Sequence, residues 1–273
     1  MEAAERSGFM DYLELVALGG IAGFTIFLGL PVALLGVSER TRQFLNALAV
    51  GILIFLVVDV LGHAWDTTTG AVTSAFKGTG PASDAWLYLG LTFGGLALGL
   101  LGLLAYERRF LGDLPEGAPP KKLSSMIAMG IGAHNLSEGL AIGQAFLAGQ
   151  VGLNQGLAVV LVIGFAAHNS TEGFGIMAPL AGAGGRPEVG FLARMLFLGG
   201  APTLLGTIVG GISYSQPAYV FFLALAGGAL VYVVMMMFSA GKRRSGNDVM
   251  MVGIFLGLCA GFATDLIVSL AGA

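Results

Sequence analysis

Charged side chains are scarce in this sequence. Of its 273 residues only 11% are Asp, Glu, Lys or Arg, whereas 56% are hydrophobic and the mean hydropathy is +0.85. This composition excludes an ordinary soluble domain and is typical of a protein that crosses the membrane several times. The net charge of −3 also lacks the basic excess of nucleic-acid-binding proteins. We therefore expect a multi-pass protein of the plasma or inner cell membrane, with lipid and not nucleic acid as its surroundings.

Several chemical signatures are missing as well. The single cysteine, Cys259, cannot form an internal disulfide. No G-x-x-x-x-G-K-[ST] loop occurs, which argues against direct use of ATP, and no H-E-x-x-H occurs, which argues against a zincin-type hydrolase. The first residues are acidic and not basic, so they do not indicate a cleaved signal segment. We expect neither enzymatic activity nor a resident cofactor.

Long apolar runs dominate what is present. There are eight of them, and each reaches the roughly 20 residues that span a bilayer core. Turn signals separate them, such as the stretch from Gly78 to Pro81. We predict an all-α integral membrane protein, one transmembrane domain over residues 1–273, built as a bundle of eight helices. The predicted spans are 13–37, 44–65, 85–106, 123–147, 153–180, 189–212, 219–238 and 249–270.

The positions of the basic residues agree with eight spans. Loops alternate sides when eight spans are threaded through a membrane, and 11 of the 13 Lys and Arg residues then fall on one side. Such an asymmetry is what the positive-inside rule expects, so both termini are predicted to lie outside. The basic residues predicted inside are Arg40, Arg42, Arg108, Arg109, Lys121, Lys122, Arg186, Arg194, Lys242, Arg243 and Arg244.

One polar motif occurs twice within these apolar runs. Residues 134–139 read HNLSEG and residues 168–173 read HNSTEG, so each copy carries a His and a Glu four residues apart. On a helix this spacing places both side chains on one face, with the Asn flanking it. The copies fall near the middle of the antiparallel spans four and five, as in the site of an inverted-repeat transporter.

The residue types of this motif indicate a divalent metal ion. Neutral imidazole and ionised carboxylate together suit Zn²⁺ first, and then Fe²⁺, Mn²⁺, Co²⁺ or Cd²⁺. Binding requires neutral His, so metal affinity is expected to fall as the pH drops below about 6–7. Two alternatives remain open. The polar pairs could be interhelical glue in a structural protein, or they could hold the zinc of an intramembrane metal-dependent hydrolase.

A second polar row lies in span two. Asp59, His63 and Asp66 are spaced to share one helical face in the outer half of the bundle. The row is either an entrance path for cations, through Asp59 and His63, or a pair that fixes helix packing. Asp265 in span eight is expected at a similar depth, where it either pairs with this row or faces water.

Small residues recur at four-residue spacing in several spans. Gly253, Gly257 and Gly261 form such a row in span eight, and Gly90 with Gly94 is another example. Rows of this kind let helix backbones approach closely. We interpret them as contacts inside the bundle, with a homodimer contact as the alternative.

With these motifs, the sequence resembles the ZIP (Zrt/Irt-like) family of divalent-metal transporters. The resemblance is carried by the two motifs in the fourth and fifth of eight spans and by the outside placement of both termini. It implies an eight-helix bundle that moves zinc, iron or manganese toward the cytoplasm by an elevator-like or rocking motion. The metal-site residues that it implies are His134, Asn135, Glu138, His168, Asn169 and Glu172.

The sequence also departs from the family pattern. Ser137 and Thr171 stand where family motifs commonly have Pro, so each helix is expected to bend through a hydroxyl bond to its own carbonyls instead. Ala201, before Pro202, stands where many members have a Glu that helps to hold a second metal. We therefore expect one metal ion.

Overall fold

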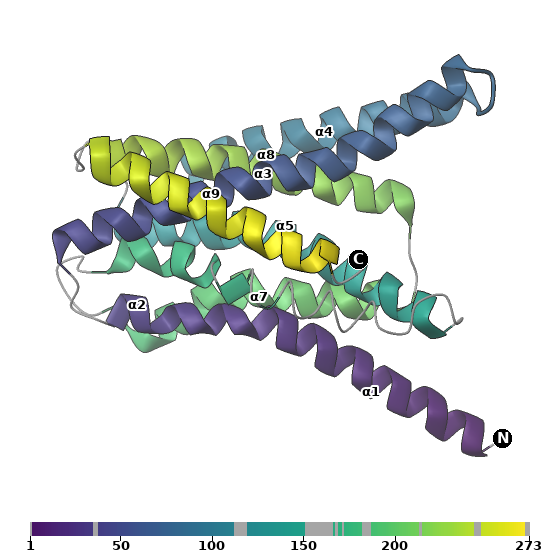
Figure 1. Cartoon of the computed structure of the whole chain (residues 1–273), viewed down its shortest axis with the longest axis horizontal. Coiled ribbons are helices and arrows are strands. Elements are labelled where there is room, and N and C mark those ends of the chain that lie inside the picture. The colour runs from purple at the N-terminus through teal and green to yellow at the C-terminus, as the bar shows by residue number, and fades with distance from the viewer. Residues whose placement is uncertain are drawn as a thin grey trace.

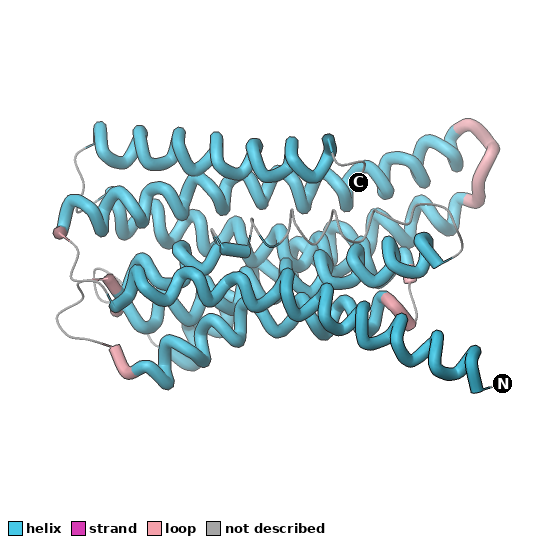
Figure 2. The backbone as a smooth tube through the Cα atoms, turned by 60° about the horizontal axis from the view of Figure 1, so that its bottom comes forward, coloured by secondary structure: helices cyan, strands magenta, loops and turns pink. Residues whose placement is uncertain are grey.

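A computed structural model gives the arrangement of most of the chain. It describes residues 2–34, 38–111, 119–150, 166, 169–170, 172–181, 187–212, 215–242 and 247–270. The described residues are almost entirely helical, as predicted (Figures 1 and 2). The α-helices are α1 (Glu2–Phe24), α2 (Leu30–Leu34), α3 (Glu39–Phe76), α4 (Ala82–Tyr106), α5 (Pro120–Gln150), α7 (Val189–Gly210), α8 (Gln216–Lys242) and α9 (Asn247–Leu270).

Three short helical turns complete these elements. The 3₁₀ turn η1 (Thr25–Gly29) joins α1 to α2, so the first predicted span is a helix with a tighter segment in its middle. A π-helical turn, η2 (Glu107–Leu111), extends α4, and a 3₁₀ turn, η3 (Ala178–Leu180), ends the part of the fifth predicted span that the structure describes.

Six described segments are long and apolar enough to cross a membrane. They are Tyr12–Leu34, Glu39–Phe76, Ala82–Arg109, Val189–Gly210, Gln216–Ser239 and Asp248–Leu266. The helix predicted for span four is present as α5, but α5 is not one of the six. Its middle carries the polar residues of the first motif, which lower its hydropathy. Most of predicted span five lies outside the described residues, so the count of eight spans stays a prediction.

The helices α3, α5, α7 and α9 run in one direction along the bundle, and α1 with α2, α4 and α8 run in the opposite direction (Figure 1). The ends that carry most of the described basic residues therefore meet at one end of the molecule, where α3, α5, α7 and α9 begin. We call this the basic end. The helix α1 begins, and α9 ends, toward the opposite side of the bundle. Most described basic residues thus lie at one end of the bundle, while the side of each loop and the placement of both termini outside a cell stay predictions.

The helix α3 is much longer than the predicted span of residues 44–65. Ser38 caps its beginning by accepting a hydrogen bond from the backbone N–H of Thr41, and it ends only at the turn that contains Gly78, whose φ is +71°. Its 38 residues measure about 57 Å at 1.5 Å per residue, whereas a bilayer core is about 30 Å thick. The span of residues 44–65 stays a prediction, and the helix itself continues beyond it beside a partner helix.

That partner is α4, which forms a helical hairpin with the last half of α3. The buried hydroxyls of Thr68 and Thr92 lie 2.7 Å apart, and the rings of Trp65 and Phe93 meet edge to face at 6.3 Å. The hairpin extends beyond the other helices at the upper right of Figure 1.

The glycine row on α9 packs against another helix inside the bundle, as interpreted from the sequence, but the row on α4 does not. A Cβ at Gly257 would meet the Leu48 carbonyl, and one at Gly253 or Gly261 would meet Ala47 or Phe55 on α3. The row on α9 is therefore covered by α3 and is not available to a second copy. By contrast, Gly90 and Gly94 have open space around them on α4.

The largest apolar cluster fills the half of the bundle nearest the basic end. It joins the early parts of α3, α5 and α7 to the last part of α8, through residues such as Leu53, Ile127, Leu196 and Val233. Ile131 is the last α5 residue in this cluster, and the polar motif begins three residues later. The motif thus lies directly beyond the apolar packing.

Candidate metal site

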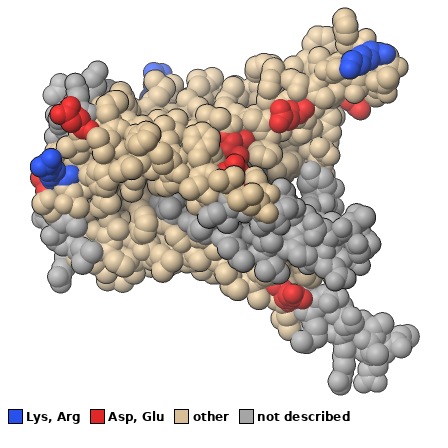
Figure 3. Space-filling view, in the orientation of Figure 1, with Lys and Arg blue, Asp and Glu red and all other residues tan. Residues whose placement is uncertain are grey.

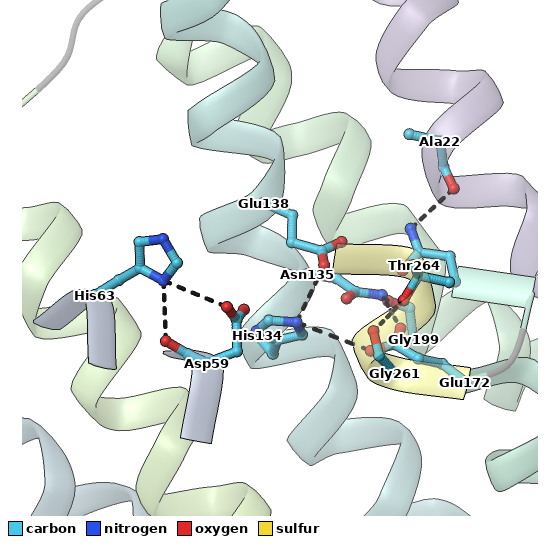
Figure 4. Close-up of polar contacts among 11 residues, drawn as sticks. Ala22, Asp59, His63, His134, Asn135, Glu138, Glu172, Gly199, Gly261 and Thr264 are labelled. Carbon is cyan, nitrogen blue, oxygen red and sulfur yellow. Dashed lines mark hydrogen bonds and ion pairs between the residues drawn. The ribbon is translucent and has the colours of Figure 1, made fainter. Parts of the chain in front are cut away.

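The first motif forms a buried acid–imidazole pair on α5. His134 and Glu138 are only 3% and 6% exposed, and His134 Nε2 lies 3.1 Å from Glu138 Oε1. The four-residue spacing brings them together because residues one turn apart share a face. Both side chains point to the same place within the bundle (Figure 4).

The second motif contributes Glu172 to the same place. Its Oε1 is 3.9 Å from His134 Nε2, and its Oε2 accepts a hydrogen bond of 2.9 Å from the amide nitrogen of Asn135. The same amide nitrogen donates to the Gly199 carbonyl of α7 at 3.0 Å. Two motifs that are 34 residues apart in the sequence therefore meet in a buried cluster, with α7 behind it (Figure 4).

The two motif asparagines both present their oxygens to the interior. Backbone carbonyls cannot donate, so the side-chain nitrogens must face them: Asn135 bonds to Gly199, and Asn169 bonds to the Ala22 carbonyl of α1 at 2.9 Å. Neither amide oxygen has a hydrogen-bond partner among the described residues, although both side chains are fully buried. Buried acceptors of this kind are costly unless an ion or water meets them.

Each motif ends in a glycine, and both glycines touch a neighbouring backbone. A Cβ at Gly139 would meet the Thr203 carbonyl of α7, and one at Gly173 would meet the Ile26 carbonyl of η1. The glycine after each Glu thus allows its helix to lie directly against another element. This close approach holds the adjacent carboxylate at a fixed position.

Not every predicted ligand belongs to this cluster in the described structure. His134, Asn135, Glu138 and Glu172 come together, and Asn169 is buried with its amide turned to α1. His168 lies outside the described residues, as do the side chains of Ser137 and Thr171. Within the described part of the chain, no three His, Cys, Asp or Glu side chains are arranged so that one metal ion could be held among them.

The second polar row lies on a different part of α3. His63 Nδ1 is 2.9 Å from the Asp59 carbonyl oxygen and 3.6 Å from its Oδ1, so the predicted pair exists (Figure 4). The His63 side chain is nevertheless 62% exposed, so it does not serve to pack helices. Gly261 of α9 lies against Phe55 of α3, and both helices run in the same direction. Four residues further along each helix, the exposed Asp265 is therefore at the same level as Asp59.

Sequence reasoning missed the backbone partners of the site. The Gly199 and Ala22 carbonyls carry no side-chain signature, so only the fold reveals them. One signal was nevertheless present, because Pro202 interrupts α7 and lacks the N–H that would bond to the Leu198 carbonyl. That carbonyl lies against Gly132 of α5, so the proline marks the place where α7 approaches the motif helix.

A family model described as ZIP Zinc transporter matches residues 116–269, which include both motifs and α5 to α9. The chain belongs to the ZIP zinc transporter family. The ZIP resemblance expected from the motifs is thereby confirmed.

Two curated relatives agree with the ZIP assignment. The chain is 30% identical over 158 residues to "Zinc transporter GufA" of Myxococcus xanthus and 31% identical over 160 residues to "Zinc transporter ZIP10" of Mus musculus. These matches cover 57% and 53% of this chain, but only 60% and 18% of the two relatives. The chain therefore spans less than two thirds of the length of either relative.

Removing the Asn135 amide is expected to destabilise the protein. In Asn135→Ala, Glu172 Oε2 and the Gly199 carbonyl both lose a buried donor, which costs about 1–3 kcal/mol. Thermal unfolding in detergent should therefore shift clearly downward. Gln43→Ala, a truncation near the start of α3 where Gln43 donates a hydrogen bond to the exposed Glu39, serves as the control and should have little effect. Equal melting temperatures for the two variants would contradict the bonding described.

Proposed function

We propose that this protein carries divalent transition-metal cations, zinc first, across the membrane toward the cytoplasm. The observation that carries the proposal is the meeting of His134 and Glu138 from one motif with Glu172 from the other, in a buried cluster inside the bundle. A transport site must bind the ion away from either surface, and such a cluster fulfils that requirement.

The chemistry of the donors supports zinc as cargo. One imidazole and two carboxylates from the described residues, with the Asn135 amide beside them, are donor types that suit Zn²⁺ and related borderline ions, although the described residues do not hold them in the arrangement of a formed metal site. The two carboxylates also offset the charge of a divalent cation. His168 is proposed to add a second imidazole, and the names of the two relatives point to zinc as well. With Ala201 on α7 in place of an acidic residue, we propose a single bound ion.

The position of the site supports inward release. Apolar packing closes the half of the bundle between the motif and the basic end. We propose that the ion arrives from the opposite side, exchanges its water for the motif side chains, and leaves when that packing opens. The helices that carry the site pack on α7 and η1 through the close glycine contacts, and they would move with these elements in an elevator-like or rocking motion.

An entrance through Asp59 and His63 follows from their depth. The contact between Thr68 of α3 and Thr92 of α4 shows which residues of the two helices lie side by side. Asp59 and His63 then lie at the level of Leu98 and Leu101, in the middle of the row of exposed apolar side chains on α4. Ionisable side chains at membrane depth normally face a water-filled cavity. We propose that the exposed Asp59–His63 pair collects cations in such a cavity.

Neutralising this pair is expected to weaken the capture of metal and not its translocation. Asp59→Asn or His63→Ala should raise the half-saturating zinc concentration about tenfold while the maximal rate changes little, because local cation concentration is lost. Initial rates of zinc uptake over a concentration series measure both quantities. Asp84→Asn, an exposed acid at the start of α4, should leave both unchanged. Unaltered half-saturation in the Asp59 and His63 variants would remove the entrance from the proposal.

The proposed function is tested by direct flux. Purified protein in proteoliposomes is supplied with labelled Zn²⁺, Fe²⁺, Mn²⁺ or Cd²⁺, and uptake is compared with that of protein-free liposomes. Saturable uptake, fastest for zinc, is expected. Folded protein that moves none of these ions would refute transport. Bound zinc without flux, together with zinc-dependent cleavage of a peptide or ester substrate, would favour the intramembrane hydrolase instead.

A further inference from the structure

A cavity of about 400 Å³ lies between the first turns of α3 and α9, far from the motif. Ser38, Arg40 and Asp248 line it on the polar side, and Phe44, Val249 and Val252 line it on the apolar side. Both helices begin side by side at the basic end (Figure 1), where acidic and basic atoms lie near each other on the surface (Figure 3). The volume falls within the range of small-ligand sites in proteins.

The lining changes character at the expected membrane boundary. Phe44 and Val249 are the first residues of the apolar runs predicted for the second and eighth spans, while Ser38, Arg40 and Asp248 precede those runs. The cavity therefore opens to water on one side and reaches hydrocarbon depth on the other. A molecule that fits it needs a polar head and an apolar tail.

The two charges of the cavity are opposite in sign. Arg40 and Asp248 are both exposed, and among the described residues no ion pair joins them, so each is available to a ligand. Arg binds phosphate through several N–H donors, and a carboxylate accepts hydrogen bonds from an ammonium group. A ligand that bears both phosphate and ammonium would meet both charges at once.

We propose that this cavity binds a phospholipid of the inner leaflet that has a primary ammonium head group, as in phosphatidylethanolamine. Arg40 holds the phosphate, Asp248 accepts from the ammonium, and an acyl chain lies along Phe44, Val249 and Val252. The lipid bridges α3 and α9, whose glycine contact begins one turn further along at Ala47 and Gly253. This inference is independent of metal transport.

Native mass spectrometry of the full chain in detergent tests the inference. The probes are phosphatidylethanolamine, phosphatidylcholine and phosphatidylglycerol with the same acyl chains, and soluble phosphoethanolamine. Phosphatidylcholine has no N–H donor for Asp248, and phosphatidylglycerol has no ammonium group. We expect retention of phosphatidylethanolamine at about tenfold lower lipid concentration than either of the others. Phosphoethanolamine should not compete, because it lacks the apolar contact.

Matched variants assign the two charges. Arg40→Ala should reduce the retention of phosphatidylethanolamine and phosphatidylglycerol alike, because both have the phosphate. Asp248→Asn should lower the retention of phosphatidylethanolamine to that of phosphatidylglycerol, and the retention of phosphatidylglycerol should not change. Arg194→Ala and Glu188→Gln, exposed charges at the same end of the bundle on and next to α7, are the controls and should behave like the wild type. Size-exclusion profiles confirm that every variant is folded.

Three results would overturn the proposal. Equal retention of the three lipids by the wild type would exclude recognition of the head group. A loss in the Arg40 and Asp248 variants no larger than in the α7 controls would show that the lipid binds elsewhere. Competition by soluble phosphoethanolamine as effective as that by the lipid would assign the cavity to a free phosphate compound.

Discussion

Glu138→Gln is expected to lower zinc uptake at sub-saturating zinc by at least about 100-fold. This decrease is larger than the decrease expected when a residue that only orients a metal ligand is replaced. Glutamine has nearly the shape of glutamate, so the packing of α5 is kept. The change removes one of the two buried carboxylates beside His134. A divalent cation that is buried with only one carboxylate is less well stabilised than one buried with two. Glu172→Gln should have a similar effect. Uptake by proteoliposomes and equilibrium binding of zinc measure the loss.

The control for these variants is Glu14→Gln. Glu14 is exposed on α1, so the same chemical change there should leave uptake near the wild-type rate. If folded Glu138→Gln protein took up zinc within about threefold of the Glu14→Gln rate, the buried carboxylates could not be the transport ligands. Loss of uptake with unchanged zinc binding would place Glu138 in the conformational step, and not at the metal.

Gly139→Val is expected to abolish the folded protein. An added Cβ at residue 139 would meet the Thr203 carbonyl and would lie 2.7 Å from the Thr207 nitrogen and 2.9 Å from the Gly206 Cα. These are backbone atoms of α7, so room is made only if α5 and α7 separate, and overpacking of a helix interface costs about 1–3 kcal/mol or more. We expect no monodisperse peak in detergent size-exclusion chromatography and no zinc uptake.

Gly94→Val provides the matched control for this prediction. Gly94 lies within a helix like Gly139, so the helix-propensity cost of valine is the same, but nothing lies within 4 Å of its added Cβ. This variant should fold and transport. If Gly139→Val also folded with wild-type uptake, α5 and α7 would not be in the close contact described here.

The sequence predicts much of the fold because lipid imposes simple rules. Each apolar run of about 20 residues has to satisfy its own backbone hydrogen bonds, so helices were expected, and the described parts of these runs are almost entirely helical. The lengths were less predictable. The helix α3 continues through Thr67, Thr69 and Thr73, beyond the apolar run from which the span was predicted, and α4 packs beside this part of it.

The candidate site was predictable only in part. The spacing of His134 and Glu138 indicates a shared helical face, and the repeated motif indicates a second contribution from Glu172; both are seen in the structure. The carbonyls that orient the asparagines belong to Ala22 and Gly199, residues without functional groups in their side chains. Their role depends on how α1 and α7 pack, which is a long-range property of the fold.

The α3–α4 hairpin has a practical consequence for imaging. A 27.9 kDa chain whose described residues are almost entirely helical gives electron microscopy few features for particle alignment inside a detergent belt. The hairpin extends beyond the rest of the bundle, is stiffened by the Thr68–Thr92 contact, and ends in the exposed turn from Lys77 to Pro81. A small rigid protein inserted at this turn, or an antibody fragment raised against it, would supply the missing landmark without touching the candidate metal site.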